Sequence, residues 1–209
     1  MDAADVAVAS RDCVVLVDMD GVICDFEAQF LQRWRKTHPS ARWIPTEART
    51  SHYVDQDASG AYDTRRSHAI IMSPGFYDSM PPIPGALDAL REMQAEGLRV
   101  CICTAPFGRG ETAANCEAEK RAWVKSHLGE DWLTPERFIC IKDKTLVPGK
   151  LLIDDKPNPS SHWSGGLARE PSWQHVVFTQ PFNLEAAECR DTPRLACWSE
   201  WREILQPLL

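Results

Sequence analysis

Short apolar runs rich in β-branched residues recur along the chain and alternate with stretches of helical periodicity. The first run, at 13–17, is continuous, as expected for a strand that is covered on both faces. Similar runs follow at 98–103, 138–141, 151–153 and 175–178. Strands that alternate with helices are typical of an α/β fold built around a parallel sheet, so we predict this fold class.

Two helices are predicted between the first three runs. Leu87, Leu90 and Met93 recur every third residue, which predicts a helix over 84–93. A second helix is predicted over 117–128. Each would connect one strand to the next, as a parallel sheet requires.

The stretch 26–80 does not fit this alternation. It contains helical pieces such as 26–34, separated by prolines, and is far longer than an ordinary connection. We predict a small, mostly helical cap domain over 26–80, inserted after the first strand of a core domain formed by 1–25 and 81–209. Residues 1–11 are predicted to be a disordered tail.

Charge and hydrophobicity exclude several classes of partner. The formal net charge of −7 argues against a surface for a nucleic-acid polymer, which would carry clustered Lys and Arg. There is no apolar run of 18 or more residues, so we expect no membrane span. The first ten residues carry two acids and no base, unlike a secretory signal or transit peptide, which predicts a cytoplasmic location.

The eight cysteines do not suggest a disulfide scaffold or a zinc site. Cys101 and Cys103 alternate within one predicted strand, Cys13 and Cys140 lie in or beside apolar runs, and no C-x-x-C pair occurs. Buried, reduced thiols in a reducing compartment are the expected state.

Polar side chains follow four of the predicted strands, at the point where each strand ends. Because ligands bind beyond the carboxyl ends of strands in open α/β sheets, we expect these side chains to share one crevice. They are Asp18 and Asp20, then Thr104, then Lys144, then Asp154 and Asp155.

The carboxylates of this crevice need a counter-charge. A close pair repels by about 4 kcal/mol at the effective dielectric of a protein surface. Lys144 cannot neutralise four of them, whereas a divalent cation together with Lys144 offsets most of their charge. Hard oxygen ligands suit Mg²⁺ rather than zinc, and Mg²⁺ commonly shares its ligands with a substrate phosphate. The sequence therefore predicts a Mg²⁺ site for a phosphorylated small molecule.

The spacing of Asp18 and Asp20 suits hydrolysis of a phosphate ester. Positions two apart at a strand end face the same side, so one carboxylate can attack phosphorus while the other protonates the leaving oxygen. Taken singly, such motifs have structural explanations, because Asp and Thr also cap helices and form turns. Their ordered occurrence after successive strands favours catalysis.

Two segments, 15–27 and 151–156, resemble the haloacid-dehalogenase-like (HAD) phosphohydrolase superfamily. Further segments resemble the 5'(3')-deoxyribonucleotidase family within it, so that the resemblance covers nearly the whole chain. These further segments are 82–93, 102–106, 143–147, 171–179 and 198–205.

The resemblance implies a Rossmann-like HAD core and Mg²⁺-dependent hydrolysis of (deoxy)nucleoside monophosphates through an aspartyl-phosphate. It assigns Asp18 as nucleophile and metal ligand. Asp20 would be the general acid/base and bind the metal through its backbone carbonyl, and Asp155 would complete the metal site. Asp154 would orient Lys144 or a metal-bound water.

The resemblance also predicts how substrate is held. Thr104, Lys144 and the backbone N–H of Ala105 would bind the phosphate. Ala105 stands where the family usually has Ser, so we expect weaker phosphate binding. The nucleobase would contact a pocket formed by Phe26, His52, Tyr53, Val54 and Ile71. A homodimer is expected from the resemblance alone.

Alternatives remain open at this stage. The first is a HAD phosphatase that acts on another small phosphate ester. The second, from a different class, is a non-catalytic phospho-accepting or nucleotide-binding domain. In phospho-accepting domains the acidic pair precedes the phosphorylated Asp, whereas here Asp154 and Asp155 come last.

Overall fold

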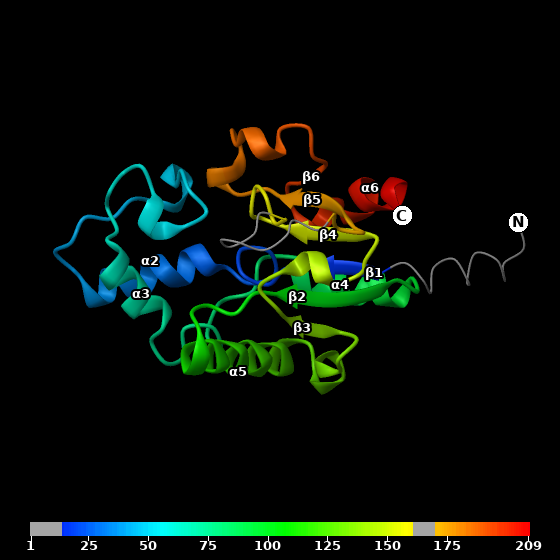
Figure 1. Ribbon diagram of the computed structural model, residues 1–209, viewed down its shortest axis with the longest axis horizontal. Helices are drawn as coiled ribbons and strands as arrows, with labels where there is room; N and C mark the ends of the chain where they lie inside the picture. The colour runs from blue at the N-terminus through cyan, green and yellow to red at the C-terminus, as the bar shows by residue number, and fades with distance from the viewer. Residues whose placement is uncertain (1–13, 161–169) are drawn as a thin grey trace, which may run out of the picture.

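A parallel six-stranded sheet forms the centre of the computed structural model, which describes residues 14–160 and 170–209 (Figure 1). The spatial order of its strands is β3-β2-β1-β4-β5-β6. The strands are β1 (Val14–Val17), β2 (Arg99–Thr104), β3 (Phe138–Cys140), β4 (Leu151–Asp154), β5 (Gln174–Phe178) and β6 (Arg194–Leu195). The α/β fold class is confirmed.

The two faces of the sheet bury different side chains. In β1, Val15 and Val17 join the larger hydrophobic cluster, whereas Leu16 between them joins a smaller one with Leu152 of β4 and Trp173. This alternation follows from the two-residue period of a strand. It explains why the first apolar run is continuous, since both of its faces are covered.

The five predicted strands are present within a residue or two. The strand β6 was not predicted, because two residues are too few to show a pattern. Cys13 and the tail predicted over 1–11 lie outside the described residues. Among the described residues, no helix combines the length and the apolarity that crossing a membrane requires.

Three α-helices lie in the described residues that follow residue 80. They are α4 (Ala86–Ala95), α5 (Gly110–His127) and α6 (Trp201–Leu205). The helix α5 begins seven residues before the predicted start at 117. Its first six residues are mostly exposed and rich in small residues, so they extend the helix without showing an apolar pattern in the sequence.

The inserted stretch 26–80 has only helical elements, which cover just under half of its residues. It contains α2 (Phe26–Thr37), α3 (Thr64–Ile71) and two 3₁₀ turns, at Thr46–Ala48 and Val54–Gln56. The Asp25 side chain begins α2 by accepting a hydrogen bond of 2.9 Å from the backbone N–H of Ala28. In Figure 1 the stretch lies beyond the carboxyl ends of the strands. The division into core and cap domains stays a prediction.

Seven of the cysteines lie in the described residues, all as free thiols. Cys101 and Cys103 are buried in β2, as expected, and Cys140 is half-buried. Cys197 is exposed, which departs from the expectation of burial.

Candidate active site

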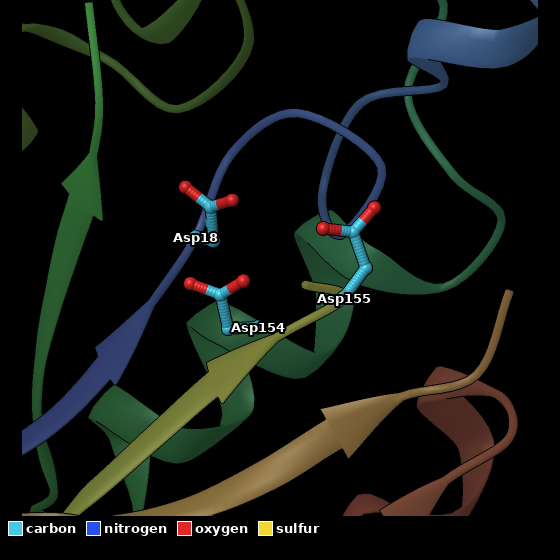
Figure 2. A group of neighbouring side chains, drawn as sticks. All are labelled: Asp18, Asp154 and Asp155. Carbon is cyan, nitrogen blue, oxygen red and sulfur yellow. The ribbon is translucent and has the colours of Figure 1, made fainter. Parts of the chain in front are cut away.

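The carboxylates that follow β1 and β4 meet where the chain order across the sheet reverses. The strands β1 and β4 pair with Val17 opposite Ile153, and the backbone N–H of Asp18 donates to Ile153 O at 2.9 Å. One carboxylate oxygen from each of Asp18, Asp154 and Asp155 lies within 4.8 Å of the other two. Figure 2 shows the three side chains together at this edge of the sheet, which is the usual ligand position in such folds.

Lys144 holds two of these carboxylates. It lies in a 3₁₀ turn, Lys144–Leu146, and its Nζ is 2.8 Å from Asp18 Oδ1 and 2.6 Å from Asp154 Oδ2. The other oxygen of Asp154 accepts from the backbone N–H of Lys156 at 2.9 Å. Both oxygens of Asp154 therefore have protein partners, which agrees with an orienting role.

A second lysine, Lys120 of α5, holds the other member of the Asp-x-Asp pair. Its Nζ lies 2.7 Å from Asp20 Oδ2, and it also donates to Thr104 Oγ1 and to the backbone oxygen of Ala105, each at 2.8 Å. The side chain of Lys120 is fully buried. Burial raises the pKa of the Asp20 carboxyl, while the adjacent charge of Lys120 opposes that rise.

The sequence analysis missed Lys120, although a signal was present. The residue lies in the predicted helix 117–128, on the same face as Cys116, Trp123 and Val124 at three- and four-residue spacing. All three of these neighbours are buried. A lysine on the apolar face of a helix indicates a buried partner of opposite charge.

Gly21 and Asp155 make the closest approach in the site. Gly21 has a φ of 75°, and a Cβ there would lie 2.1 Å from Asp155 Oδ2. Only glycine accepts both that backbone conformation and that proximity. The turn after Asp20 therefore brings the backbone directly against the carboxylate that follows β4.

The loop after β5 supports the same turn, and its role was also missed. Gln180 donates from Nε2 to Gly21 O at 2.7 Å. Asn183, fully buried, donates from Nδ2 to the backbone oxygen of Asp155 at 2.8 Å. These residues follow a strand end, so the argument that found the other site residues could have included them.

The charges of the site fit a divalent cation. Lys120 and Lys144 pair with Asp20, Asp18 and Asp154, and Asp155 is the fourth carboxylate of the site. Two positive charges therefore meet four acidic groups, which leaves two negative charges uncompensated when all four are ionised. No group of the described residues, 14–160 and 170–209, donates a hydrogen bond to the buried Oδ1 of Asp155. Burial and the carboxylates of Asp154 and Asp18 raise the pKa of Asp155 well above its usual value. A cation at the Asp cluster would allow Asp155 to be ionised.

Of the residues predicted to form the base pocket, His52 approaches this cluster, and Tyr53 packs against His52. His52 Nδ1 is 3.8 Å from Asp155 Oδ1, and its ring packs edge-on against Phe182 at 5.6 Å. Burial lowers the pKa of His52 to about 4, so the imidazole is neutral near pH 7. The Lys156 ammonium lies 5.9 Å from the centre of the Tyr53 ring.

Phe26, Val54 and Ile71 pack in or against the larger hydrophobic cluster. Phe26 is partly buried and packs edge-on against Phe76 at 5.4 Å. Val54 and Ile71 are buried in the larger hydrophobic cluster. The assignment of these three residues to a base pocket stays a prediction.

Comparison with known proteins decides the family. A family model described as "5' nucleotidase, deoxy (Pyrimidine), cytosolic type C protein" matches residues 12–208. The chain belongs to the 5'(3')-deoxyribonucleotidase family. It is 42% identical over 193 residues to a putative 5'(3')-deoxyribonucleotidase of Bordetella pertussis, covering 92% of this chain and 95% of that protein. It is 38% identical to the cytosolic type of Homo sapiens, covering 94% of each.

Solved structures place this deoxyribonucleotidase family member in the HAD fold. A HAD family hydrolase from Deinococcus radiodurans superposes with a TM-score of 0.59 at 16% identity, covering 95% of this chain and 97% of that one. A haloacid dehalogenase-like protein from Agrobacterium tumefaciens gives 0.57 at 12% identity, covering 93% and 98%. The chain is thus a HAD-fold enzyme that hydrolyses phosphoric monoesters.

Proposed function

We propose that this enzyme is a Mg²⁺-dependent 5'(3')-deoxyribonucleotidase that converts (deoxy)nucleoside monophosphates to nucleoside and phosphate through an aspartyl-phosphate on Asp18. The observation that carries the mechanism is that the two carboxylates of the Asp-x-Asp pair contact different lysines. Asp18 is paired with Lys144 and Asp20 with Lys120, so two carboxylates on one turn have different surroundings. Such a difference suits one nucleophile and one acid/base.

In the first displacement, an Asp18 oxygen forms a bond to phosphorus as the ester P–O bond breaks. Asp20, whose pKa burial raises, gives its proton to the departing nucleoside oxygen. In the second displacement, Asp20 takes a proton from water as the water oxygen attacks phosphorus. The Asp18–phosphorus bond then breaks, and phosphate and the free carboxylate are restored.

The phosphate would be held by Thr104, the backbone N–H of Ala105 and Lys144. Mg²⁺ would be held by the carboxylates of Asp18 and Asp155 and by the backbone carbonyl of Asp20. When bound, the ion supplies positive charge to the phosphate oxygens, which lowers the cost of the charge that develops during transfer. Asp154 keeps Lys144 directed at Asp18 through the 2.6 Å ion pair.

The substrate class rests on the family, since relatives covering nearly the whole chain are named 5'(3')-deoxyribonucleotidases. His52 and Tyr53 support it, because they put aromatic surface within reach of the Asp cluster. A nucleobase can stack on such surface. The base and sugar preferred, a homodimeric assembly and a cytoplasmic location remain predictions.

The decisive assay measures phosphate release from a panel of 5'- and 3'-(deoxy)nucleoside monophosphates and sugar phosphates, with Mg²⁺ and with a chelator. We expect nucleotides to be preferred and the chelator to abolish release. Asp18→Asn removes the nucleophile and should lower kcat by about 10⁴-fold or more, as removal of a covalent nucleophile does elsewhere. A matched exposed acid, Asp88→Asn, should leave kcat unchanged; its carboxylate is 79% exposed.

Each part of the proposal has its own contrary outcome. Activity that survives Asp18→Asn would remove the aspartyl-phosphate, and activity in chelator would remove the metal. Release confined to sugar phosphates would keep the mechanism and reject the nucleotidase. Nucleotide binding without phosphate release would indicate the non-catalytic alternative.

A further inference from the structure

A buried cluster of charges lies in the inserted stretch, outside the catalytic group. The guanidinium of Arg49 is 2.6 Å from Glu27 Oε2 and 3.1 Å from Asp57 Oδ2. All three side chains are at least nine-tenths buried, and the Arg49 group also lies 5.9 Å from the centre of the Tyr62 ring. The catalytic mechanism above uses none of these four residues.

Arg49 closes a short loop that carries His52 and Tyr53. Its Nη2 donates to the backbone oxygen of Ser51 at 2.8 Å, immediately before His52. At the other end of the loop, Asp57 Oδ2 accepts from Arg49 Nε and also from the backbone N–H of Thr50 at 2.8 Å. One side chain thus holds both ends of the segment between residues 49 and 57.

The same guanidinium connects this loop to the start of α2. Glu27 is the second residue of α2 and follows Phe26 directly. Arg49 therefore joins the two chain segments that carry Phe26 on one side and His52 and Tyr53 on the other. Across from the loop, His52 reaches Asp155 and Phe182.

We propose that Arg49 is a positioning residue for substrate binding: its three-way contact fixes the loop of His52 and Tyr53 against α2 and so pre-forms the wall that contacts the nucleoside. This inference rests on the proposed function for the identity of the ligand. Arg49 itself does not touch the substrate. It acts through the loop, by removing the need to order that loop when the nucleotide binds.

The chemistry of the cluster favours positioning over simple stability. Burying an ion pair costs solvation that the attraction between the charges often only balances, so apolar residues could fill the same space as stably. The planar fork of Arg offers donors in fixed directions, which a single ammonium does not. Here those donors reach Glu27, Asp57 and Ser51.

The test uses the substitution Arg49→Lys in the full chain. This substitution keeps the positive charge and removes the planar set of guanidinium donors. Two quantities are compared: KM for the preferred nucleoside monophosphate and the inhibition constant of inorganic phosphate, which reports the phosphate site alone. We expect KM to rise about tenfold while the phosphate constant and kcat change less than about twofold. Hydrogen exchange of the backbone amides of 50–57 should become faster.

Arg33→Lys is the matched control. Arg33 also lies on α2 and donates to several groups, including Ser73 Oγ at 2.8 Å and Ser79 Oγ at 3.1 Å, but it does not contact the loop 49–57. It should leave both constants unchanged. If Arg49→Lys does not fold, Glu27→Gln replaces it, because the amide keeps an acceptor for Arg49; KM should then rise about threefold.

Two results would overturn the inference. One is an equal rise of KM and of the phosphate constant, which indicates general damage to the site. The other is an unchanged KM in the Arg49→Lys variant. Failure of the proposed function is seen separately, in the wild-type substrate panel. If the wild type prefers another phosphate ester, the same comparison is made with that ester.

Discussion

At the scale of the residue, Gly21 has a left-handed backbone conformation and lies directly against a carboxylate of the proposed metal site. Its φ of 75° and its closeness to Asp155 are both tolerated only without a side chain. Gly21 directly follows Asp20, and its backbone oxygen accepts a hydrogen bond from Gln180 Nε2. A methyl group at position 21 would collide with the Asp155 carboxylate.

Gly21→Ala should therefore displace the Asp155 carboxylate, with which the new Cβ would collide. Because displacements of about 1 Å can cost 10²-fold, we expect kcat to fall by about that factor. The Mg²⁺ concentration for half-maximal activity should rise, as measured by titration of the metal in the phosphate-release assay.

Gly60→Ala is the control for backbone strain. Gly60 has a φ of 62°, with no atom within 4 Å of the position of a Cβ. It should cost roughly 1–2 kcal/mol in the free energy of unfolding, without a change in metal dependence. Equal metal dependence in the two variants would refute the role given to Gly21.

At the scale of the element, α5 connects the inserted stretch to the carboxylate of Asp20. Glu119 accepts from the backbone N–H groups of Gly75 at 2.7 Å and Tyr77 at 2.9 Å. The next residue, Lys120, holds Asp20, and Trp123 Nε1 donates to Met80 O at 2.7 Å. One helix thus fixes where the inserted stretch ends and how Asp20 is directed.

Lys120→Met keeps an unbranched side chain that is one heavy atom shorter, and it removes the charge and the hydrogen bonds. Without Lys120, Asp20 loses the partner that directs it, so we expect kcat to fall by about 10²-fold, within the range for a general acid/base. KM should rise as well, because Lys120 also donates to Thr104 Oγ1, which the proposal assigns to the phosphate. Steady-state kinetics on the preferred nucleotide measures both quantities.

Lys125→Met serves as the comparison on the same helix. Lys125 is 58% exposed and pairs with Glu130 at 3.2 Å, away from the site. The kcat of the Lys125→Met variant should match that of the wild type. A Lys120→Met enzyme with normal kcat would show that Asp20 does not depend on α5.

At the scale of the whole molecule, the buried charges of the inserted stretch should make stability depend on pH. Burial raises the pKa of Glu27 to about 7, although the Arg49 charge opposes that rise. The folded protein therefore keeps a proton that the unfolded chain releases from about pH 4.5 upward. Stability from this group is present at low pH and is lost as pH rises towards 7.

Glu27→Gln should remove this dependence. Between pH 5 and pH 7.5, the wild type should lose more free energy of unfolding than the variant, by up to about 3 kcal/mol. Urea denaturation at the two pH values measures the difference. Asp57 does not contribute in this window, because its hydrogen bonds lower its pKa to about 2. Parallel pH dependence in both proteins would contradict the prediction.

The sequence by itself determined the sheet and the cluster of acidic side chains at its edge. Strands such as β1 and β4 are buried on both faces, so their apolar runs are continuous and visible without a structure. Because parallel strands end at the same edge, residues that follow them meet there, and Asp18, Asp154 and Asp155 do so.

Only the tertiary structure decided the partners of that group. Lys120 and Asp20 are 100 positions apart, and Gln180 and Gly21 are 159 apart, so no local pattern relates them. Arg49 looks like any charged loop residue until the fold buries it against Glu27. Periodicity records which face of an element is apolar, whereas an ion pair depends on where two distant segments come together.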